Sequence, residues 1–216
     1  LFYQLLIGEM EMRAGRAGSA YEVVLDAAKR TNDDSLYQRA VDIALQARAG
    51  EQALAATKSW RQAHPGSNDA RRYQIQIIIA LNRIDEVSEP LKSWLASLPV
   101  DQRSGLIAAT PRFLQRVDDR TKVATVLEQW LGAYRDAPET RTAARVAIAR
   151  AWLAASNAPK ALALAEQAHA DDPEAPGTYL LALELMTLQP SAERIATQFL
   201  ARDMVDSGLR LAYVRS

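Results

Sequence analysis

The eight residues KSWRQAHP, numbered 58–65, return further along the chain as KSWLASLP at 92–99. Lys-Ser-Trp recurs after 34 residues, and the proline five residues beyond each tryptophan recurs at the same interval. A period between about 20 and 50 residues is the signature of stacked structural repeats, each of which touches only its neighbours. A period of 34 residues is typical of repeats made of two helices, so it predicts an all-α chain of stacked helix pairs.

Small or mid-sized apolar residues recur at two places in this frame. The first set is Gly8, Val41, Ile75, Leu114 and Ala149. The second set is Ala20, Ala53, Val87, Val126 and Ala161. Side chains of this size are required where two helices cross closely, because a large side chain would hold the helix axes apart. The two sets therefore predict the crossing point within each helix pair.

Helical spacing and turn signals support the same frame. Val123, Leu127 and Trp130 lie three or four residues apart, as on one face of a helix. Glycine and proline interrupt the pattern at Gly15, Gly18, Gly50, 65–66, 157–159, 173–177 and 189–190. The pattern predicts about thirteen helices, as about six pairs and one unpaired helix at 206–214. Pro90 falls inside the second helix of the third pair, which predicts a kink or a late helix start there.

Composition excludes several classes of partner and chemistry. Lys and Arg together number 26, as do Asp and Glu, so no overall field attracts nucleic acid or an anionic membrane. The apolar start at 1–7 carries no basic region and is too short to span a membrane. The chain has no cysteine and only two histidines, His64 and His169, which leaves little for metal binding. We predict no nucleic-acid partner, no membrane contact by this segment, no cofactor and no metal.

The residues that could carry chemistry have a simpler structural interpretation. Trp60, Trp94, Trp130 and Trp152 recur at similar places in the helical frame, which favours packing between helices over ligand stacking. The aspartate pairs at 33–34, 118–119 and 171–172 stand beside turns, where helix capping is the default role. Phosphate-binding loops, nucleophile elbows and a supported Ser-His-Asp set are missing from the sequence. We therefore predict that the chain is not an enzyme.

The repeat pattern resembles that of the tetratricopeptide repeat (TPR) family. Matching residues are Gly8, Ala20 and Ala27, then Ala53 and Pro65, then Pro99, then Ala133 and Pro138, then Ala161, Ala168 and Pro173. The chain departs from the family where Trp60 and Trp94 replace alanine and Glu11 replaces an aromatic residue. The interval from Pro99 to Pro138 is 39 residues, which predicts about five extra residues in a loop. The resemblance implies one domain over 1–216, a right-handed superhelical solenoid of about six TPR-like pairs plus one extra C-terminal helix.

The same resemblance implies a binding groove. In that family the first helices of the pairs line a concave surface, and fixed positions of each repeat face it. The predicted partner-binding residues of the groove are Glu9, Arg13, Gln38, Asp42, Arg72, Gln76, Gln115, Arg150 and Glu184. They form a mixed polar surface suited to an extended or helical peptide. The alternative is that about half of them are merely solvated helix faces.

One branch of the family binds the carboxylate of chaperone tails, and the chain lacks its residues. That clamp uses lysine and asparagine at the fifth and ninth positions of the repeat. Here those positions carry Leu5 and Glu9, Gln38 and Asp42, and Arg72 and Gln76. Recognition of such tails is therefore disfavoured.

The first two repeats also resemble a narrower group. They carry Phe2, YQLL at 3–6, Glu9, Arg13, Ala20, Ala27, Thr31, QRA at 38–40, IAL at 43–45, Ala53, Ala56 and Trp60. This succession is similar to the amino-terminal repeats of Gram-negative outer-membrane lipoproteins. Members of that family are periplasmic adaptors that bind a carboxyl-terminal processing protease and present cell-wall hydrolases to it. The resemblance implies an acylated cysteine upstream of Leu1 and more repeats beyond Ser216. It also implies a location in the periplasm, attached to the outer membrane, and the cytoplasm is the alternative location.

Three classes of function remain open. The first is a non-catalytic scaffold or adaptor that binds a peptide or protein partner in the groove. The second is a structural module that assembles with itself, through Leu209, Leu211 and Val214 of the last helix docking on another copy. An enzyme is the third class, and the sequence selects no carboxylate pair for it.

Overall fold

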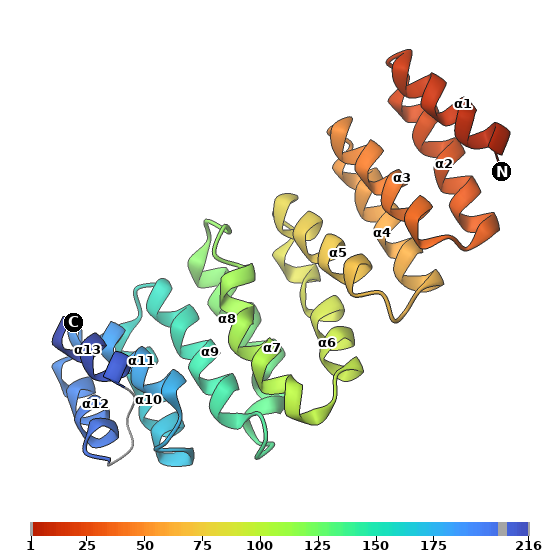
Figure 1. Cartoon of the computed structure of the whole chain (residues 1–216). Coiled ribbons are helices and arrows are strands. Elements are labelled where there is room, and N and C mark those ends of the chain that lie inside the picture. Colours follow the sequence, from red (N-terminus) through yellow and green to blue (C-terminus); the bar gives the residue numbers. More distant parts are fainter. Residues whose placement is uncertain (1, 203–206, 216) are drawn as a thin grey trace. The chain divides into compact units, whose positions relative to one another are not determined.

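The computed structural model describes residues 2–202 and 207–215. In these residues the chain forms thirteen α-helices and three short 3-10 helices, and no strand (Figure 1). The all-α fold and the number of helices predicted from the repeat are confirmed. A last helix beyond the sixth pair is also confirmed; Asp206, where its start was predicted, lies outside the described residues. No helix among the described residues is long and apolar enough to cross a membrane.

The helices fall into two compact units, Leu1–Ser97 and Leu98–Ser216. The first unit contains α1 (Phe2–Arg13), α2 (Ala17–Thr31), α3 (Asp34–Gln46), α4 (Gly50–Ala63), α5 (Asn68–Ala80), η1 (Ile84–Glu86) and α6 (Ser88–Ser97). The second contains α7 (Val100–Phe113), α8 (Arg120–Leu131), η2 (Gly132–Arg135), α9 (Arg141–Ala154), α10 (Ala158–Asp171), α11 (Pro176–Met186), η3 (Pro190–Ala192), α12 (Glu193–Leu200) and α13 (Ser207–Arg215). The prediction of one domain over 1–216 stays a prediction.

Most consecutive helices pack on one another within their unit, whereas α7 packs on α9 rather than on α8. In the first unit α2 packs between α1 and α3, and α4 packs between α3 and α5. In the second unit α9 is central, because it packs against α7, α8, α10 and α11. Stacking between neighbours is the arrangement that lets each amphipathic pair bury the apolar side of the next.

The same turn ends the first helix of four pairs. Its central residue has the left-handed conformation, with φ of 76°, 56°, 55° and 60° at Gly15, Arg48, Asn82 and Ser156. The next residue donates its backbone N–H to the carbonyl five residues earlier, as Arg16 to Glu11, Ala49 to Ala44, Arg83 to Ile78 and Asn157 to Trp152. This is the Schellman arrangement, which satisfies carbonyls that the helix end leaves free. The second helical segment begins two residues after the left-handed residue in all four pairs.

This constant turn places a small residue where the two helices cross. Ala20, Ala53, Val87 and Ala161 each stand five residues after the left-handed residue, and all are 0% exposed. On the facing helix, a Cβ added to Gly8 would lie 2.9 Å from Cγ2 of Val24. The predicted crossing point is confirmed in the first pair by the closeness of Gly8 to Val24, and the burial of Ala53, Val87 and Ala161 agrees with it in the other three pairs.

The fourth pair departs from the predicted frame. α7 ends at Phe113, so Leu114 lies beyond the helix, in a longer turn that continues to Asp119. By distance from the helix starts, Ile107 and Val123 take the places that were predicted for Leu114 and Val126. The prediction was wrong because it placed the fourth pair by counting back from Pro138. That count assumes that the five or so extra residues between Pro99 and Pro138 precede the pair, whereas they lie in the segments that follow α7 and α8.

Two of the four tryptophans form core, as predicted, and two do not. Trp60 and Trp130 are buried. The indole N–H of Trp60 also donates to Oδ1 of Asp34. Trp94 and Trp152 are only half-buried. The indole of Trp152 donates to Glu128 at 3.2 Å, and Nζ of Lys160 lies 3.9 Å from the ring centroid.

Helix starts confirm the predictions made for proline and aspartate. α6 begins at Ser88, so Pro90 lies in its first turn, where an N–H has no intrahelical partner to lose. Asp33 accepts from the backbone N–H of Ser35 at 2.9 Å, and Asp119 accepts from that of Lys122 at 2.8 Å. Asp171 has another role, because its carboxylate pairs with Arg145.

The close crossing predicts a sharp size limit at Ala53. We expect Ala53→Leu to lower the free energy of unfolding by about 1–3 kcal/mol, because the added methylenes must displace packed neighbours. Ala55→Leu is the matched control, since Ala55 is exposed on the same helix and its enlargement should change stability by less than about 0.5 kcal/mol. Urea unfolding followed by circular dichroism measures both. Equal losses for the two variants would contradict the crossing point.

Candidate functional site

The predicted groove residues of the first unit lie on three neighbouring first helices. Glu9 and Arg13 are on α1, Gln38 and Asp42 on α3, and Arg72 and Gln76 on α5. All six are exposed or half-buried. We call this set the first-helix face.

Side-chain bonds run from one first helix to the next across this face. Nη2 of Arg39 on α3 donates to Glu9 on α1 at 2.7 Å. Nε2 of Gln38 donates to the hydroxyl of Tyr73 on α5 at 3.3 Å. An exposed ion pair such as Arg39–Glu9 contributes about 0–1 kcal/mol, so these bonds mark which helices adjoin and add little to stability.

Three members of the face have no side-chain partner among the described residues: Arg13, Asp42 and Gln76. They present a guanidinium, a carboxylate and an amide on the first helices of three successive pairs, α1, α3 and α5. Leu45, one turn beyond Asp42, adds an exposed apolar side chain. Unpaired donors and acceptors beside an apolar anchor are the chemistry that recognises the backbone and side chains of a peptide.

The second unit holds its own part of the prediction. Arg150 on α9 and Glu184 on α11 are 34 residues apart, and Nη2 of Arg150 lies 3.3 Å from Oε1 of Glu184. Nε of Arg150 is buried without a partner among the described residues. Leu180 is exposed one turn before Glu184. This pair repeats the bridge between first helices that Arg39 and Glu9 make in the first unit.

Gln115 does not share this placement. It was predicted to face the groove from a first helix, but α7 ends at Phe113 and Gln115 lies in the turn that follows. The cause is the same shift of register that misplaced Leu114. A contact between Gln115 and a partner stays a prediction, now from a turn.

Sequence reasoning missed the residues that bridge the first helices. Arg39 and Tyr73 were not predicted, although each makes one of the two bonds between neighbouring helices. Arg39 and Tyr73 occupy the same place in successive repeats, 34 residues apart, but their bonds span 30 and 35 residues, so the repeat period alone does not identify their partners.

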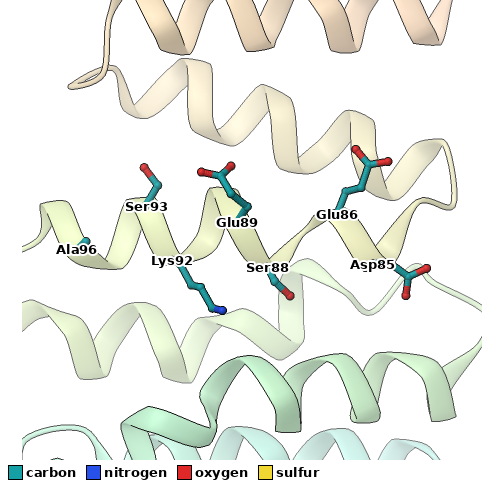
Figure 2. A pocket seen from close by; sticks show the side chains of 7 residues that line it. All are labelled: Asp85, Glu86, Ser88, Glu89, Lys92, Ser93 and Ala96. Atoms are coloured by element: carbon teal, nitrogen blue, oxygen red, sulfur yellow. The ribbon is translucent and has the colours of Figure 1, made fainter.

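An open hollow runs along η1 and α6. Its volume is about 520 Å³, and it is lined by Asp85, Glu86, Ser88, Glu89, Lys92, Ser93 and Ala96. Figure 2 shows Glu86, Glu89 and Ser93 on one side of α6 and Lys92 and Ser88 on the other. The glutamates are already paired: Glu86 with Arg83 and Lys58, and Glu89 with Arg61. The glutamates therefore offer little unused charge to a ligand, and Lys92 is a charged lining side chain without a partner among the described residues.

Arg61 links three helices at the edge of this hollow. From α4, its Nη1 donates to Gln74 on α5 at 2.6 Å and to Glu89 on α6 at 2.9 Å. The hydrogen bond from Arg61 holds the pKa of Glu89 below its ordinary value. The arrangement joins α4 to α6 and is structural.

Both histidines make contacts within the fold. Nδ1 of His64 lies 3.9 Å from Asp34, and Nε2 of His169 lies 2.9 Å from the amide oxygen of Gln198. Among the described residues, no group of three His, Cys, Asp or Glu side chains is placed to hold a metal ion.

Comparison with known proteins finds similarity to solved structures. The sequence matches no protein-family model and no curated protein. PilF of Pseudomonas aeruginosa is 16% identical, with a TM-score of 0.43 over 87% of this chain and 84% of that one. PilW, a type IV pilus biogenesis factor, is 14% identical, with a TM-score of 0.44 over 97% of this chain and 96% of PilW. The Thermus thermophilus TPR protein TTC0263 is 20% identical, with a TM-score of 0.36 over 92% of this chain and 98% of TTC0263.

The lowered pKa of Glu89 predicts a pH-dependent contribution to stability. Because the folded state favours the ionised carboxylate, the contribution is present above the ordinary glutamate pKa of 4.5 and is lost as pH falls through the lower folded value. We expect Glu89→Gln to be less stable than the parent at pH 7, by less than about 1 kcal/mol because the carboxylate is largely exposed.

Urea unfolding at neutral and at acid pH measures the difference. It should disappear at acid pH, where the carboxyl is protonated in both states. Glu139→Gln is the control, since Glu139 is exposed and has no partner among the described residues. If the difference in the free energy of unfolding between the parent and Glu89→Gln grows as the pH falls, the pKa of Glu89 is not lowered in the folded state.

Proposed function

We propose that this chain is a non-catalytic scaffold that binds a peptide or an extended segment of a protein on its first-helix face. The observation that carries the proposal is the set of unpaired polar groups on neighbouring first helices, Arg13, Asp42 and Gln76. Their neighbours Glu9 and Gln38 are tied across the helices, so the unpaired groups sit on an aligned surface.

The shape and charge of this surface favour a polypeptide over a small molecule. Small-molecule sites are concave and mostly enclosed. The first-helix face instead extends over α1, α3 and α5. Its two acidic residues, Glu9 and Asp42, are balanced by Arg13 and Arg72. A partner with both donors and acceptors therefore fits better than a polyanion such as nucleic acid.

The finer form of the proposal is a periplasmic adaptor. The resemblance of the first two repeats to outer-membrane lipoproteins supports a partner among carboxyl-terminal processing proteases and their cell-wall hydrolase substrates. In this role the first-helix face holds one protein so that another can act on it.

Self-assembly through the last helix is the second candidate. Leu211 and Val214 on α13 are exposed, which supports it. Leu209 is half-buried, and its backbone carbonyl accepts from the hydroxyl of Tyr179 at 2.5 Å.

The test is capture of partners from a Gram-negative periplasmic extract, followed by titration calorimetry with each recovered protein in purified form. The variant Asp42→Arg/Gln76→Glu changes two unpaired groups of the face without breaking a bond. Glu22→Arg/Gln62→Glu is the matched control, because it makes the same charge changes at exposed positions of second helices.

We expect the face variant to weaken binding at least about tenfold and the control to leave it unchanged. If the parent, the face variant and the control variant bind the partner with equal affinity, the binding site is not on the first-helix face. Recovery of a processing protease or a hydrolase would support the adaptor role, whereas recovery of the bait alone would favour self-assembly.

A further inference from the structure

The carboxylate of Asp42 is left without a counter-charge on the first-helix face. Arg39 precedes it by three residues on α3, within reach of an ion pair along the helix. The guanidinium of Arg39 instead binds Glu9 on α1, at 2.7 Å. On α5, Arg72 is held by Asp69 at 2.8 Å. Both arginines are therefore committed to other acids, and Asp42 has no partner among the described residues.

The unpaired cation of the face does not neutralise Asp42 either. Arg13 is the last residue of α1. Aligned on the left-handed turn residues, it corresponds to Gln46, which stands one turn beyond Asp42. No hydrogen bond or ion pair joins Arg13 to Asp42 among the residues that the structure describes. A cation from outside the chain can therefore bind Asp42 without breaking an existing bond.

Aliphatic side chains lie beside this carboxylate. Leu45 follows Asp42 by three residues, on the same side of α3, and is 41% exposed. Aligned on the same turn residues, Ile79 takes the place of Leu45 on α5 and is half-buried. α3 packs against α2 and α4, and α5 packs against α4 and α6. Both side chains are thus accessible on helices with neighbours on either side, so their exposure is not an effect of a chain end.

The spacing of the acid and the aliphatic residue fits an extended polypeptide. Side chains three residues apart on a helix have Cβ atoms about 5–6 Å apart. In an extended chain, residues two apart point to the same side, and they are separated by about 6.6 Å. An extended segment with a basic residue and an aliphatic residue two positions apart can therefore contact Asp42 and Leu45 together. The residue between them points away from the face.

We propose that the first-helix face recognises an extended segment in which one residue separates a lysine or arginine from an aliphatic residue. The inference rests on the proposed function and names the chemistry of the partner. Asp42 pairs with the basic side chain, and Leu45 and Ile79 pack against the aliphatic one. An acidic residue in place of the basic one is rejected, because it brings a second carboxylate against Asp42.

Selection from a library of short random peptides displayed on phage tests this specificity. The baits are the parent chain, Asp42→Lys and Glu22→Lys. Glu22→Lys is the matched control, because it makes the same charge reversal at an exposed position of α2. The parent and Glu22→Lys should enrich peptides with a basic residue two positions from an aliphatic one. Asp42→Lys should enrich an acidic residue in place of the basic one.

The outcomes separate this inference from the proposed function. If the parent enriches peptides without a preferred basic residue, or if Asp42→Lys keeps the preference of the parent, the inference is overturned and peptide binding stands. If the parent enriches no peptide, the inference and the proposed function both fail.

Affinities measured by fluorescence anisotropy test the charge pair directly. The probe is a synthetic peptide of the enriched sequence, compared with a variant in which glutamine replaces the basic residue. The replacement should weaken binding to the parent about three- to fivefold, the effect of a partly exposed ion pair, and should not change binding to Asp42→Asn. Circular dichroism checks that Asp42→Asn keeps the parent helicity. An equal loss of affinity in the parent and in Asp42→Asn would show that another acid binds the basic residue, and would overturn the proposal.

Discussion

The close crossing of two helices within a pair is the constraint on which the rest of the structure depends. Ala20, Ala53, Val87 and Ala161 bring second helices against first helices, and the left-handed turn fixes their distance along the chain. Within the first unit, this geometry brings α1, α3 and α5 within reach of one another's side chains, as the bonds from Arg39 to Glu9 and from Gln38 to Tyr73 show.

Sequence patterns predict the parts of this chain that the repeat dictates. The period of 34 residues and the small residues predicted the fold class, the number of helices and the crossing points in four pairs. They failed in the fourth pair, because proline spacing counts inserted residues without locating them. Leu114 and Gln115 were placed on a helix that ends at Phe113 for this reason.

The candidate site was harder to predict than the fold. Helical position identifies which side chains are exposed, but not which of them are paired across helices. Arg72 binds Asp69 on its own helix, and Arg150 binds Glu184 on the next first helix, whereas Asp42 has no partner among the described residues. These outcomes depend on rotamers and side-chain reach, which no spacing rule contains. Trp94 shows the same limit, since it shares its motif with Trp60 but is only half-buried.

The left-handed turn also has a consequence for how this chain can evolve. Glycine occupies it at residue 15, but Arg48, Asn82 and Ser156 adopt the same conformation at a conformational cost of about 1 kcal/mol each. Three of the four turns therefore lie above their lowest attainable energy. Replacing Arg48, Asn82 or Ser156 by glycine would therefore raise the free energy of unfolding. Such a gain can offset destabilising changes on the exposed faces of the chain.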